Sequence, residues 1–250
     1  MSSTRKKNIW LWNHYATDMF KNCGGRHYWF AENLIKQGYK ATVFCANTYH
    51  NKPEHIDTGS KKYKKEIING IHFVFIKTTP ALKNGLKRIR NMLLFYLNLF
   101  PVAKAIAKTD GKPDVIIASS VHPLTMVAGI KIAGRLKIPC ICEVRDLWPE
   151  AMFYCGQLKE KSLLGRILVS GEKWIYKKAD ALIFTKEGDV DYIREKKWDK
   201  GQGGSVDLRK CYYINNGIDL EGFNKSKKEN LIDDPDFENG KFNVVYTGSI

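Results

Sequence analysis

Two adjacent glycines near the amino terminus, Gly24 and Gly25, are of a type and spacing that can bring a backbone close to a ligand. They stand just ahead of a predicted helix that begins at Arg26. Glycine has no Cβ atom, and the first N–H groups of a helix have no partner within it, so such a loop can approach a phosphate. A tight turn that binds nothing is the alternative, and the glycines alone do not decide between the two.

A histidine and an arginine–aspartate pair follow two later apolar segments. His122 stands in Ser119-Ser120-Val121-His122-Pro123, directly past an apolar run, where its titratable ring would lie at the rim of a ligand crevice. Arg145 and Asp146 follow the next apolar run and precede Trp148-Pro149. The pair could bind a polar substrate or form an internal ion pair beneath an aromatic plug. His122 could equally be a surface histidine before a proline.

The elements that must position these groups alternate between strands and helices. Apolar segments predict strands at residues 8–13, 41–46, 113–119, 138–144, 179–185 and 211–215. Helices are predicted between them, at residues 26–37, 82–108, 125–136, 163–178 and 188–195. This alternation indicates an α/β fold with a parallel sheet, which binds ligands beyond the carboxyl ends of its strands.

A hairpin interrupts the alternation within residues 66–76. Asn69-Gly70 between apolar runs is a strong signal for its turn. His72 lies inside one of the hairpin strands, so we interpret it as a structural residue. The basic run from Lys61 to Lys65 is predicted to be a mobile loop.

The charge balance favours an anionic partner. The chain of 250 residues has 41 basic and 26 acidic residues and a formal net charge of +15. A membrane surface, a nucleic acid or a phosphorylated substrate would suit such an excess. We recognise no nucleic-acid motif, so nucleic acid is not an expected partner. A dinucleotide cofactor is also not expected, because the first loop lacks G-x-G-x-x-G and no acidic residue ends the second strand at Ala46.

The cysteines and the amino terminus indicate a cytoplasmic protein. The six cysteines are scattered, several of them in apolar runs, and are interpreted as reduced, buried thiols. Cys140-x-Cys142 lacks the spacing of a zinc or redox pair. The first residues lack a signal-peptide cleavage site. No apolar run reaches the roughly 18 residues that span a bilayer.

The segment from Leu82 to Phe100 combines cations with a long apolar run. It is predicted to be too short to span a membrane, but it could lie on a bilayer with its apolar side down. The alternative is a helix that covers the sheet and turns its basic end to water.

The composition changes near the carboxyl terminus. Residues 224–240 are charged and polar and are predicted to be a linker between a first domain, residues 1–223, and the start of a second, residues 241–250. The apolar run at residues 241–247 predicts the first strand of that second domain, and the ending resembles a cut just inside it.

Taken together, these landmarks resemble the N-terminal half of family-4 glycosyltransferases with the two-Rossmann-domain GT-B fold. The resemblance covers essentially the whole chain and rests on the order of its motifs. They are the Gly24-Gly25 loop, Gln37-Gly38-Tyr39, Pro113-Asp114-Val115-Ile116, Ser119 to Pro123, Arg145-Asp146-Leu147-Trp148-Pro149, Ala179-Asp180-Ala181-Leu182-Ile183, Ile214 to Phe223, and Tyr246-Thr247-Gly248-Ser249. Asp146 to Pro149 most resembles bacterial enzymes that build O-antigen or capsular polysaccharide on a lipid carrier.

The resemblance implies a retaining hexosyl or acetamidohexosyl transfer from a nucleotide sugar, UDP-linked, without cofactor or metal. It places Gly24 and Gly25 near the donor phosphates, His122 at the reacting sugar, and Arg145 and Asp146 near the acceptor. Gly248 and Ser249 would open a donor phosphate loop.

The expected partners are the nucleotide sugar and a polyprenyl-phosphate-linked or saccharide acceptor, with an anionic membrane surface as a further one. The location implied is the cytoplasm, peripheral at the inner face of the plasma membrane. The family's donor motifs belong to the second domain, so this chain alone is expected to be inactive. The alternative is a non-catalytic, basic Rossmann-like module that binds anionic membrane or a partner subunit.

Overall fold

The computed structural model describes residues 5–82, 85–120, 122–231, 235 and 240–246. It divides the chain into two units, residues 1–216 and residues 217–250, and each is described by itself.

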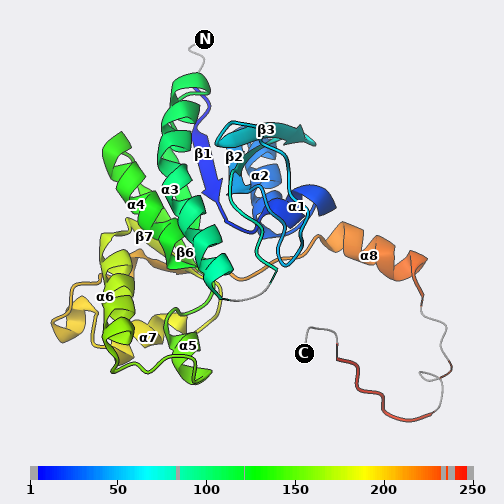
Figure 1. Ribbon diagram of the computed structural model, residues 1–250. Coiled ribbons are helices and arrows are strands. Elements are labelled where there is room, and N and C mark those ends of the chain that lie inside the picture. Colours follow the sequence, from blue (N-terminus) through cyan, green and yellow to red (C-terminus); the bar gives the residue numbers. More distant parts are fainter. Residues whose placement is uncertain (1–4, 83–84, 121, 232–234, 236–239, 247–250) are drawn as a thin grey trace. The chain divides into compact units, whose positions relative to one another are not determined.

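The first unit is built on one eight-stranded sheet (Figure 1). The strand order is β3-β4-β2-β1-β5-β6-β7-β8, and only the β3–β4 pair is antiparallel. The strands are β1 (Asn8–Trp12), β2 (Lys40–Ala46), β3 (Tyr63–Ile68), β4 (Ile71–Ile76), β5 (Val115–Ser119), β6 (Cys140–Val144), β7 (Ala181–Phe184) and β8 (Cys211–Tyr213).

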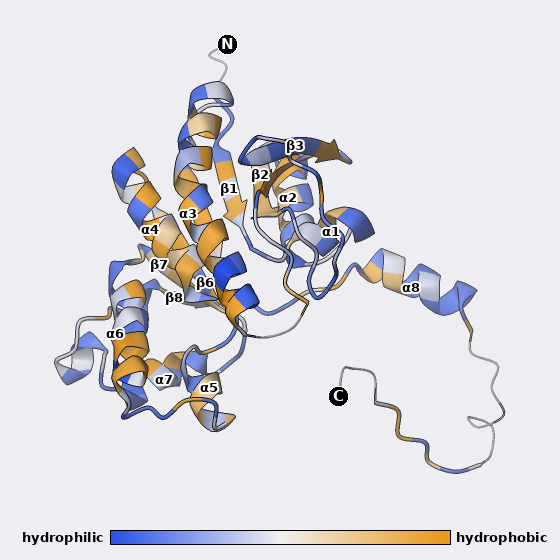
Figure 2. Ribbon diagram, in the orientation of Figure 1, coloured by the Kyte–Doolittle hydropathy of each residue, from blue (hydrophilic) through white to orange (hydrophobic). Residues whose placement is uncertain are grey.

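Helices cover both faces of this sheet, and the predicted Rossmann-like architecture is confirmed. They are α1 (Thr17–Asn22), α2 (Arg26–Lys36), α3 (Leu86–Thr109), α4 (Pro123–Leu136), α5 (Glu150–Tyr154), α6 (Leu163–Lys178) and α7 (Asp189–Glu195). Along β1, Trp10 and Trp12 pack into the core shared with α3, α4 and α6, whereas Ile9 and Leu11 pack with α1 and α2. Because both faces are covered, the central parallel strands are almost continuously apolar, whereas the edge strand β3 is hydrophilic over much of its length in Figure 2.

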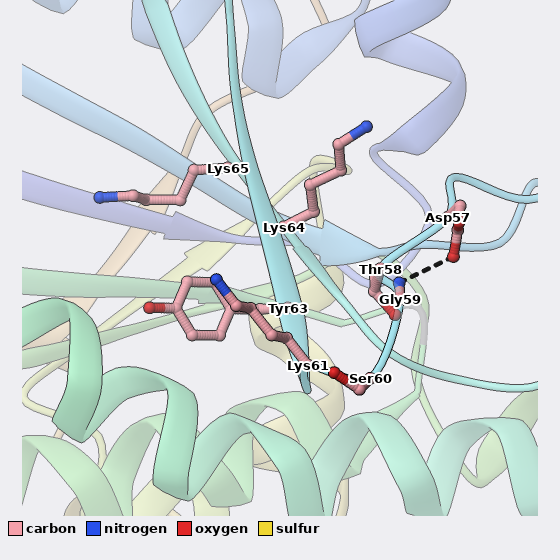
Figure 3. Close-up of a pocket in the computed structure, with 8 residues that line it drawn as sticks. All are labelled: Asp57, Thr58, Gly59, Ser60, Lys61, Tyr63, Lys64 and Lys65. Atoms are coloured by element: carbon pink, nitrogen blue, oxygen red, sulfur yellow. Dashed lines mark hydrogen bonds between the residues drawn. The ribbon is translucent and has the colours of Figure 1, made fainter.

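The predicted hairpin is present, but of the basic run before it only Lys61 and Lys62 lie in a loop. Asn69 and Gly70 both have positive φ, as a tight turn between β3 and β4 requires. Tyr63, Lys64 and Lys65 belong to β3, where pairing with β4 orders them. Together with the turn at residues 57–61 they line an open surface pocket (Figure 3).

A short helix, α1, occupies the middle half of the predicted first loop. Thr17 donates a hydrogen bond to the carbonyl of Ala46 at 2.6 Å. Phe20 packs edge-on against Phe73 and Phe75, with ring centroids 5.1 and 5.0 Å away. These tertiary contacts stabilise a helix of only six residues, which the local sequence pattern does not reveal.

Helix α3 has 24 residues and passes through Pro101 without ending. By length and composition alone it could cross a membrane, which corrects the prediction that the segment is too short. Its Phe95, Leu99 and Ile106 are nevertheless fully buried against the sheet. The helix therefore covers the sheet with one of its faces.

The second unit contains α8 (Leu220–Glu229), which occupies part of the predicted linker. The Asp219 side chain accepts a hydrogen bond from the Gly222 N–H at 3.1 Å and caps this helix. Residues 241–246 form no strand, contrary to the prediction, because no neighbouring strand pairs with them in the described part of the chain. Gly248 and Ser249 lie outside the described residues.

Candidate functional site

The candidate site lies where the chain changes direction across the sheet. After β1 the chain adds β2 and β4 on one side, and it then returns to place β5 on the other. The loops beyond β1 and β5 therefore diverge at their carboxyl ends, which is the position where open α/β sheets bind ligands.

Two histidines meet at this switch point. His14 follows β1, and His122 precedes α4 as its N-cap residue. The Nδ1 atom of His14 lies 2.7 Å from Nε2 of His122, and both side chains are buried. Among the described residues, the outer nitrogens, Nε2 of His14 and Nδ1 of His122, have no hydrogen-bond partner, although the Asn91 side chain is close enough to His14 to oppose the lowering of its pKa. The His122 ring, which was predicted to lie at the rim of a crevice, is thus inside the protein. His14, which holds it there, was not among the residues selected from the sequence.

Both histidines are neutral at physiological pH. Burial lowers the pKa of His122 to about 4. Burial, and next the neighbouring His122, hold the pKa of His14 well below its usual value. Two neutral rings form one hydrogen bond in which either can donate, so Nδ1 of His122 can present either a lone pair or an N–H. Phe95 stacks on His14 with a centroid distance of 4.5 Å and fixes the plane of that ring.

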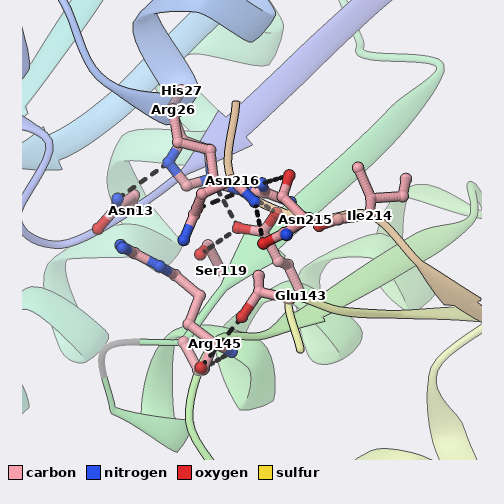
Figure 4. A network of polar contacts seen from close by, with 11 residues as sticks. Asn13, Arg26, His27, Ser119, Glu143, Arg145, Ile214, Asn215 and Asn216 are labelled. Atoms are coloured by element: carbon pink, nitrogen blue, oxygen red, sulfur yellow. Dashed lines mark hydrogen bonds and ion pairs between the residues drawn. The ribbon is translucent and has the colours of Figure 1, made fainter. Parts of the chain in front are cut away.

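A buried charged network, drawn in Figure 4, is joined to the histidine pair through Asn13, the neighbour of His14 in the chain. Glu143, in β6, has no exposed surface. Its Oε1 accepts from Nε of Arg26 at 2.8 Å, and its Oε2 accepts from the Ser119 hydroxyl at 2.6 Å. The His27 ring places Nε2 2.9 Å from the same Oε2. Three elements, α2, β5 and β6, therefore converge on one carboxylate.

The orientation of His27 follows from its other contact. Nδ1 of His27 lies 3.0 Å from Nδ2 of Asn13. The backbone N–H of Tyr15 donates to Oδ1 of Asn13, so the Asn13 amide must turn its NH₂ group to His27. Nδ1 of His27 is thus an acceptor, and the ring carries its proton on Nε2, facing Glu143.

The network keeps Glu143 ionised. Burial would raise the pKa of this carboxyl, but the contact with His27, the charge of Arg26 and the Ser119 hydrogen bond lower it to about 2. The remaining Arg26 N–H groups donate to the carbonyls of Asn215 at 2.6 Å and Ile214 at 2.8 Å. Arg26 thereby ties the segment that leaves β8 to the middle of the sheet.

The two glycines have different roles. Gly25 is the N-cap of α2 with φ 103° and ψ 165°, a conformation essentially restricted to glycine. A Cβ atom there would lie 3.0 Å from Cγ of Met19. Gly24 has no positive φ, and its N–H is already bonded to the carbonyl of Met19 at 3.3 Å. Gly25 thus brings Arg26 and His27 to the network, while Gly24 closes α1.

Arg145 and Asp146 do not pair with each other in the described contacts. The Arg145 N–H donates to the hydroxyl of Ser120, and the half-buried side chain extends beside the network in Figure 4. Asp146 is exposed and pairs with Lys186 at 3.0 Å. The sequence left open whether Arg145 and Asp146 bind a substrate or form an internal ion pair. The internal ion pair is not observed.

An apolar pocket adjoins the loops that carry His122 and Arg145. It has a volume of about 180 Å³ and is lined by residues such as Pro123, Trp148 and Ile167. Glu172 stands in its wall, where its carboxylate accepts hydrogen bonds from Tyr176 and Tyr192, each at 2.8 Å. Burial raises the pKa of Glu172 to about 8.

Several site residues could have been found from the sequence. His14 follows the first strand just as His122 follows a later one, so the rule that selected His122 applies to it. Glu143 is a charge within an apolar strand, which signals a buried partner. Among the described residues no group of three His, Cys, Asp or Glu side chains could hold a metal ion. All six cysteines are free, with Cys23 and Cys155 exposed rather than buried.

A solved structure shares this fold. A sucrose-phosphate synthase from Thermosynechococcus elongatus is similar with a TM-score of 0.53 and 14% sequence identity, over 89% of this chain and 96% of that chain. The calicheamicin glycosyltransferase CalG4 has a TM-score of 0.42 and 11% identity, over 87% of this chain and 54% of that chain. HepE from Anabaena, solved with UDP and glucose, has a TM-score of 0.43 and 13% identity, over 88% of this chain and 49% of that chain. This chain thus spans about half the length of the last two.

The amino-acid sequence identifies the protein family of this chain. No curated protein matched it. A family described as "Glycosyl transferase 4-like domain" matches residues 25–202, which include α2, His122, Glu143 and Arg145. That match covers most of the chain and agrees with the predicted glycosyltransferase fold. The chain therefore belongs to the glycosyl transferase 4-like domain family.

Proposed function

We propose that this chain is the N-terminal, acceptor-binding domain of a retaining, nucleotide-sugar-dependent glycosyltransferase of cell-surface polysaccharide biosynthesis. The observation that carries the proposal is the buried His14–His122 pair at the switch point, with two ring nitrogens that lack hydrogen-bond partners in the described part of the chain. Unsatisfied buried polar groups are rare and call for a functional explanation. A sugar hydroxyl can both donate and accept, so it complements either form of His122.

The other residues take roles around this pair. The donor is a UDP-linked hexose or acetamidohexose, and its diphosphate lies toward Gly24, Gly25 and the N-terminus of α2, where the helix dipole favours negative charge. Arg145 and Asp146 contact the acceptor. No metal is required, because amide and cationic groups stabilise the leaving diphosphate.

The acceptor is a polyprenyl-phosphate-linked or simple saccharide of the O-antigen or capsular type, met at the cytoplasmic face of the plasma membrane. We propose that the chain by itself does not transfer sugar, because the second wall of the cleft comes from a donor-binding domain. The Lys-rich surface and the net charge of +15 suit a phosphate-bearing acceptor.

Chemical-shift mapping on the isotope-labelled chain tests this proposal. UDP-glucose, UDP-N-acetylglucosamine and a short-chain prenyl diphosphate-linked sugar serve as probes. We expect the largest shifts in the loops after β1, β5 and β6, and their loss in His122→Gln. His72→Gln, in β4, is the matched control. Shifts confined to the opposite edge of the sheet would contradict the proposed site, and sugar transfer by the chain alone would contradict its proposed inactivity.

A second candidate is a non-catalytic module that binds anionic membrane. The exposed apolar residues of α3 favour it. This candidate predicts vesicle binding without any shift at His14 or His122 when sugar ligands are added.

A further inference from the structure

Helix α3 contributes a buried asparagine to the surroundings of the histidine pair. Asn91 lies one helical turn before Phe95, whose ring stacks on His14 with centroids 4.5 Å apart. Side chains one turn apart lie on the same face of a helix. On that face Arg88 donates to the hydroxyl of Tyr15 at 3.0 Å, and Tyr15 follows His14 in the chain. One face of α3 therefore packs against the segment that carries His14.

The orientation of the Asn91 amide is fixed by its NH₂ group. Nδ2 donates to the carbonyl oxygen of Thr79 at 2.6 Å and to the hydroxyl oxygens of Thr48 and Thr78, both at 3.2 Å. A main-chain carbonyl can only accept, so the NH₂ group must face Thr79. The carbonyl oxygen, Oδ1, is the end of the amide left to face His14. Burial lowers the pKa of His14, and the Asn91 side chain opposes this shift, as a carbonyl oxygen beside a ring N–H does.

This amide determines where His14 carries its proton. Oδ1 of Asn91 has no hydrogen to offer, so it favours the form of the ring with a proton on Nε2. Burial lowers the pKa of His14, so the ring is neutral and has a single ring proton. Nδ1 of His14 is then a lone pair. The opposite arrangement would turn the Nε2 lone pair of His14 toward the Asn91 oxygen, which leaves two buried acceptors without a hydrogen between them.

The same reasoning continues to His122. Its Nε2 lies 2.7 Å from Nδ1 of His14 and must therefore donate to that lone pair. Burial lowers the pKa of His122 to about 4, so its single ring proton is the one used in this contact. Nδ1 of His122 is left as a lone pair, and no described residue forms a hydrogen bond with it. The contact between the two rings permits two arrangements of protons, and Asn91 selects one of them.

A second asparagine acts on a histidine in the same way, with its amide reversed. Asn13 turns its NH₂ group to Nδ1 of His27 at 3.0 Å, which leaves the His27 proton on Nε2, toward Glu143 (Figure 4). Asn91 turns its oxygen to His14, the residue next to Asn13. In both cases a buried amide, held by a main-chain group, determines where a histidine carries its proton.

We propose that Asn91 and His14 are positioning residues that hold His122 with its proton on Nε2 and a hydrogen-bond acceptor at Nδ1. This acceptor takes a hydrogen bond from a ligand hydroxyl or amide N–H, and it disfavours an ionised phosphate oxygen, which can only accept. The choice of ligand group rests on the proposed function, in which a sugar hydroxyl meets His122. The arrangement of protons does not rest on it and is measurable without a ligand.

Imidazole nitrogen NMR on the chain labelled with ¹⁵N-histidine tests the proposal at neutral pH without ligand. Protonated and unprotonated ring nitrogens have well-separated shifts, and correlations to the hydrogens on the ring carbons assign each nitrogen. The variant His122→Gln identifies the signals of that ring by their loss. We expect His14 and His122 each to carry a proton on Nε2 and none on Nδ1. A proton on Nδ1 of His122 would overturn the proposal.

The variant Asn91→Leu, which removes the amide at nearly the same size, tests the role of Asn91. We expect the ratio of the Nδ1-protonated to the Nε2-protonated form of His122 to rise roughly fivefold, because His14 can then donate from Nδ1. Asn98→Leu is the matched control, since Asn98 lies on the same helix and donates to the carbonyl of Lys77 at 2.8 Å. Circular dichroism verifies folding, and Asn91→Ala replaces the leucine variant should that variant not fold. An unchanged ratio in the folded variant, or an equal rise in Asn98→Leu, would reject the role of Asn91.

Addition of UDP-glucose separates this inference from the proposed function. The expected proton positions, together with a sugar-induced shift at Nδ1 of His122, would support both. The expected proton positions without any sugar-induced shift would retain the positioning role and reject the proposed function. Sugar-induced shifts at a His122 ring that carries its proton on Nδ1 would retain the proposed function and reject the positioning role.

Discussion

The two buried polar clusters at the carboxyl edge of the sheet differ in how completely they are satisfied. Around Glu143, both carboxylate oxygens have partners, and Arg26 uses its donors on Glu143 and on two main-chain carbonyls. Around His122, the contact with His14 is the one hydrogen bond of the ring in the described contacts, and each histidine keeps an unpartnered nitrogen. The clusters are joined through Asn13 and His14, which are adjacent in the chain.

This difference distinguishes a structural network, around Glu143, from a candidate ligand site, around His122. A buried network whose carboxylate and guanidinium are hydrogen-bonded holds its elements in place and leaves those two groups no capacity for a ligand. A neutral pair with free capacity can take up a ligand hydroxyl. We therefore expect changes at Arg26 or Glu143 to lower stability, and changes at His122 to affect ligand binding more than folding.

The largest effect is expected from Arg26→Ala. The substitution leaves the buried Glu143 carboxylate without its arginine, so the free energy of unfolding should fall by about 3–5 kcal/mol. Urea denaturation measures the loss. Arg194→Ala is the control, because Arg194 pairs with Asp191 at the surface and should cost about 0.5 kcal/mol or less. Similar losses in the two variants would show that Glu143 does not depend on Arg26.

The two clusters should respond to acid in different pH ranges. The folded pKa of His122 is about 4 against an ordinary 6.5, so the unfolded chain binds the proton first and stability falls as the pH drops from about 6.5 to about 4. The folded pKa of Glu143 is about 2 against an ordinary 4.5, so its contribution is present above about 4.5 and is lost between about 4.5 and about 2. Each of these two pKa shifts corresponds to a change of about 3 kcal/mol in the free energy of unfolding.

Denaturation midpoints across pH distinguish the ranges. His122→Gln should weaken the pH dependence of stability between about 6.5 and about 4 and leave that between about 4.5 and about 2. Glu143→Gln should weaken the dependence in the lower of these two ranges. His14 acts in the same direction as His122, so some slope in the upper range should remain in His122→Gln. An unchanged upper range in that variant would mean that His122 is not buried as a neutral ring.

The smallest effects on stability are expected from alanine substitutions at Gly24 and Gly25, and the two substitutions should differ. Gly25→Ala forces a side chain into a backbone conformation that costs about 1–3 kcal/mol, and it also crowds Met19. Gly24→Ala has no such backbone demand, and its nearest atoms are 3.7 Å from an added Cβ, so we expect a change within about 0.5 kcal/mol. Thermal or urea unfolding compares the two, and equal losses would show that α2 does not depend on the Gly25 conformation.

Regular elements were predictable because their patterns are local. The helix at Leu163–Lys178 and the turn at Asn69-Gly70 lie where periodicity and turn chemistry predict them. Helices α1 and α8 were missed for opposite reasons. Tertiary contacts of Thr17 and Phe20 stabilise α1, whereas the capping residue Asp219 before α8 was a local signal that the polar composition obscured.

The sequence by itself determined the α/β alternation, the family and the strand ends where site residues belong. Apolar runs, turns and motif order can be recognised from residues that are close in the chain. These patterns were enough to select Gly25, His122 and Arg145 as candidate site residues. Only the tertiary structure decided which groups meet. His14 and His122 are separated by 108 positions, and Arg26 and Glu143 by 117. Which strand lies beside which, and hence which side chains share a buried pocket, depends on sheet order, which no local pattern of residues encodes.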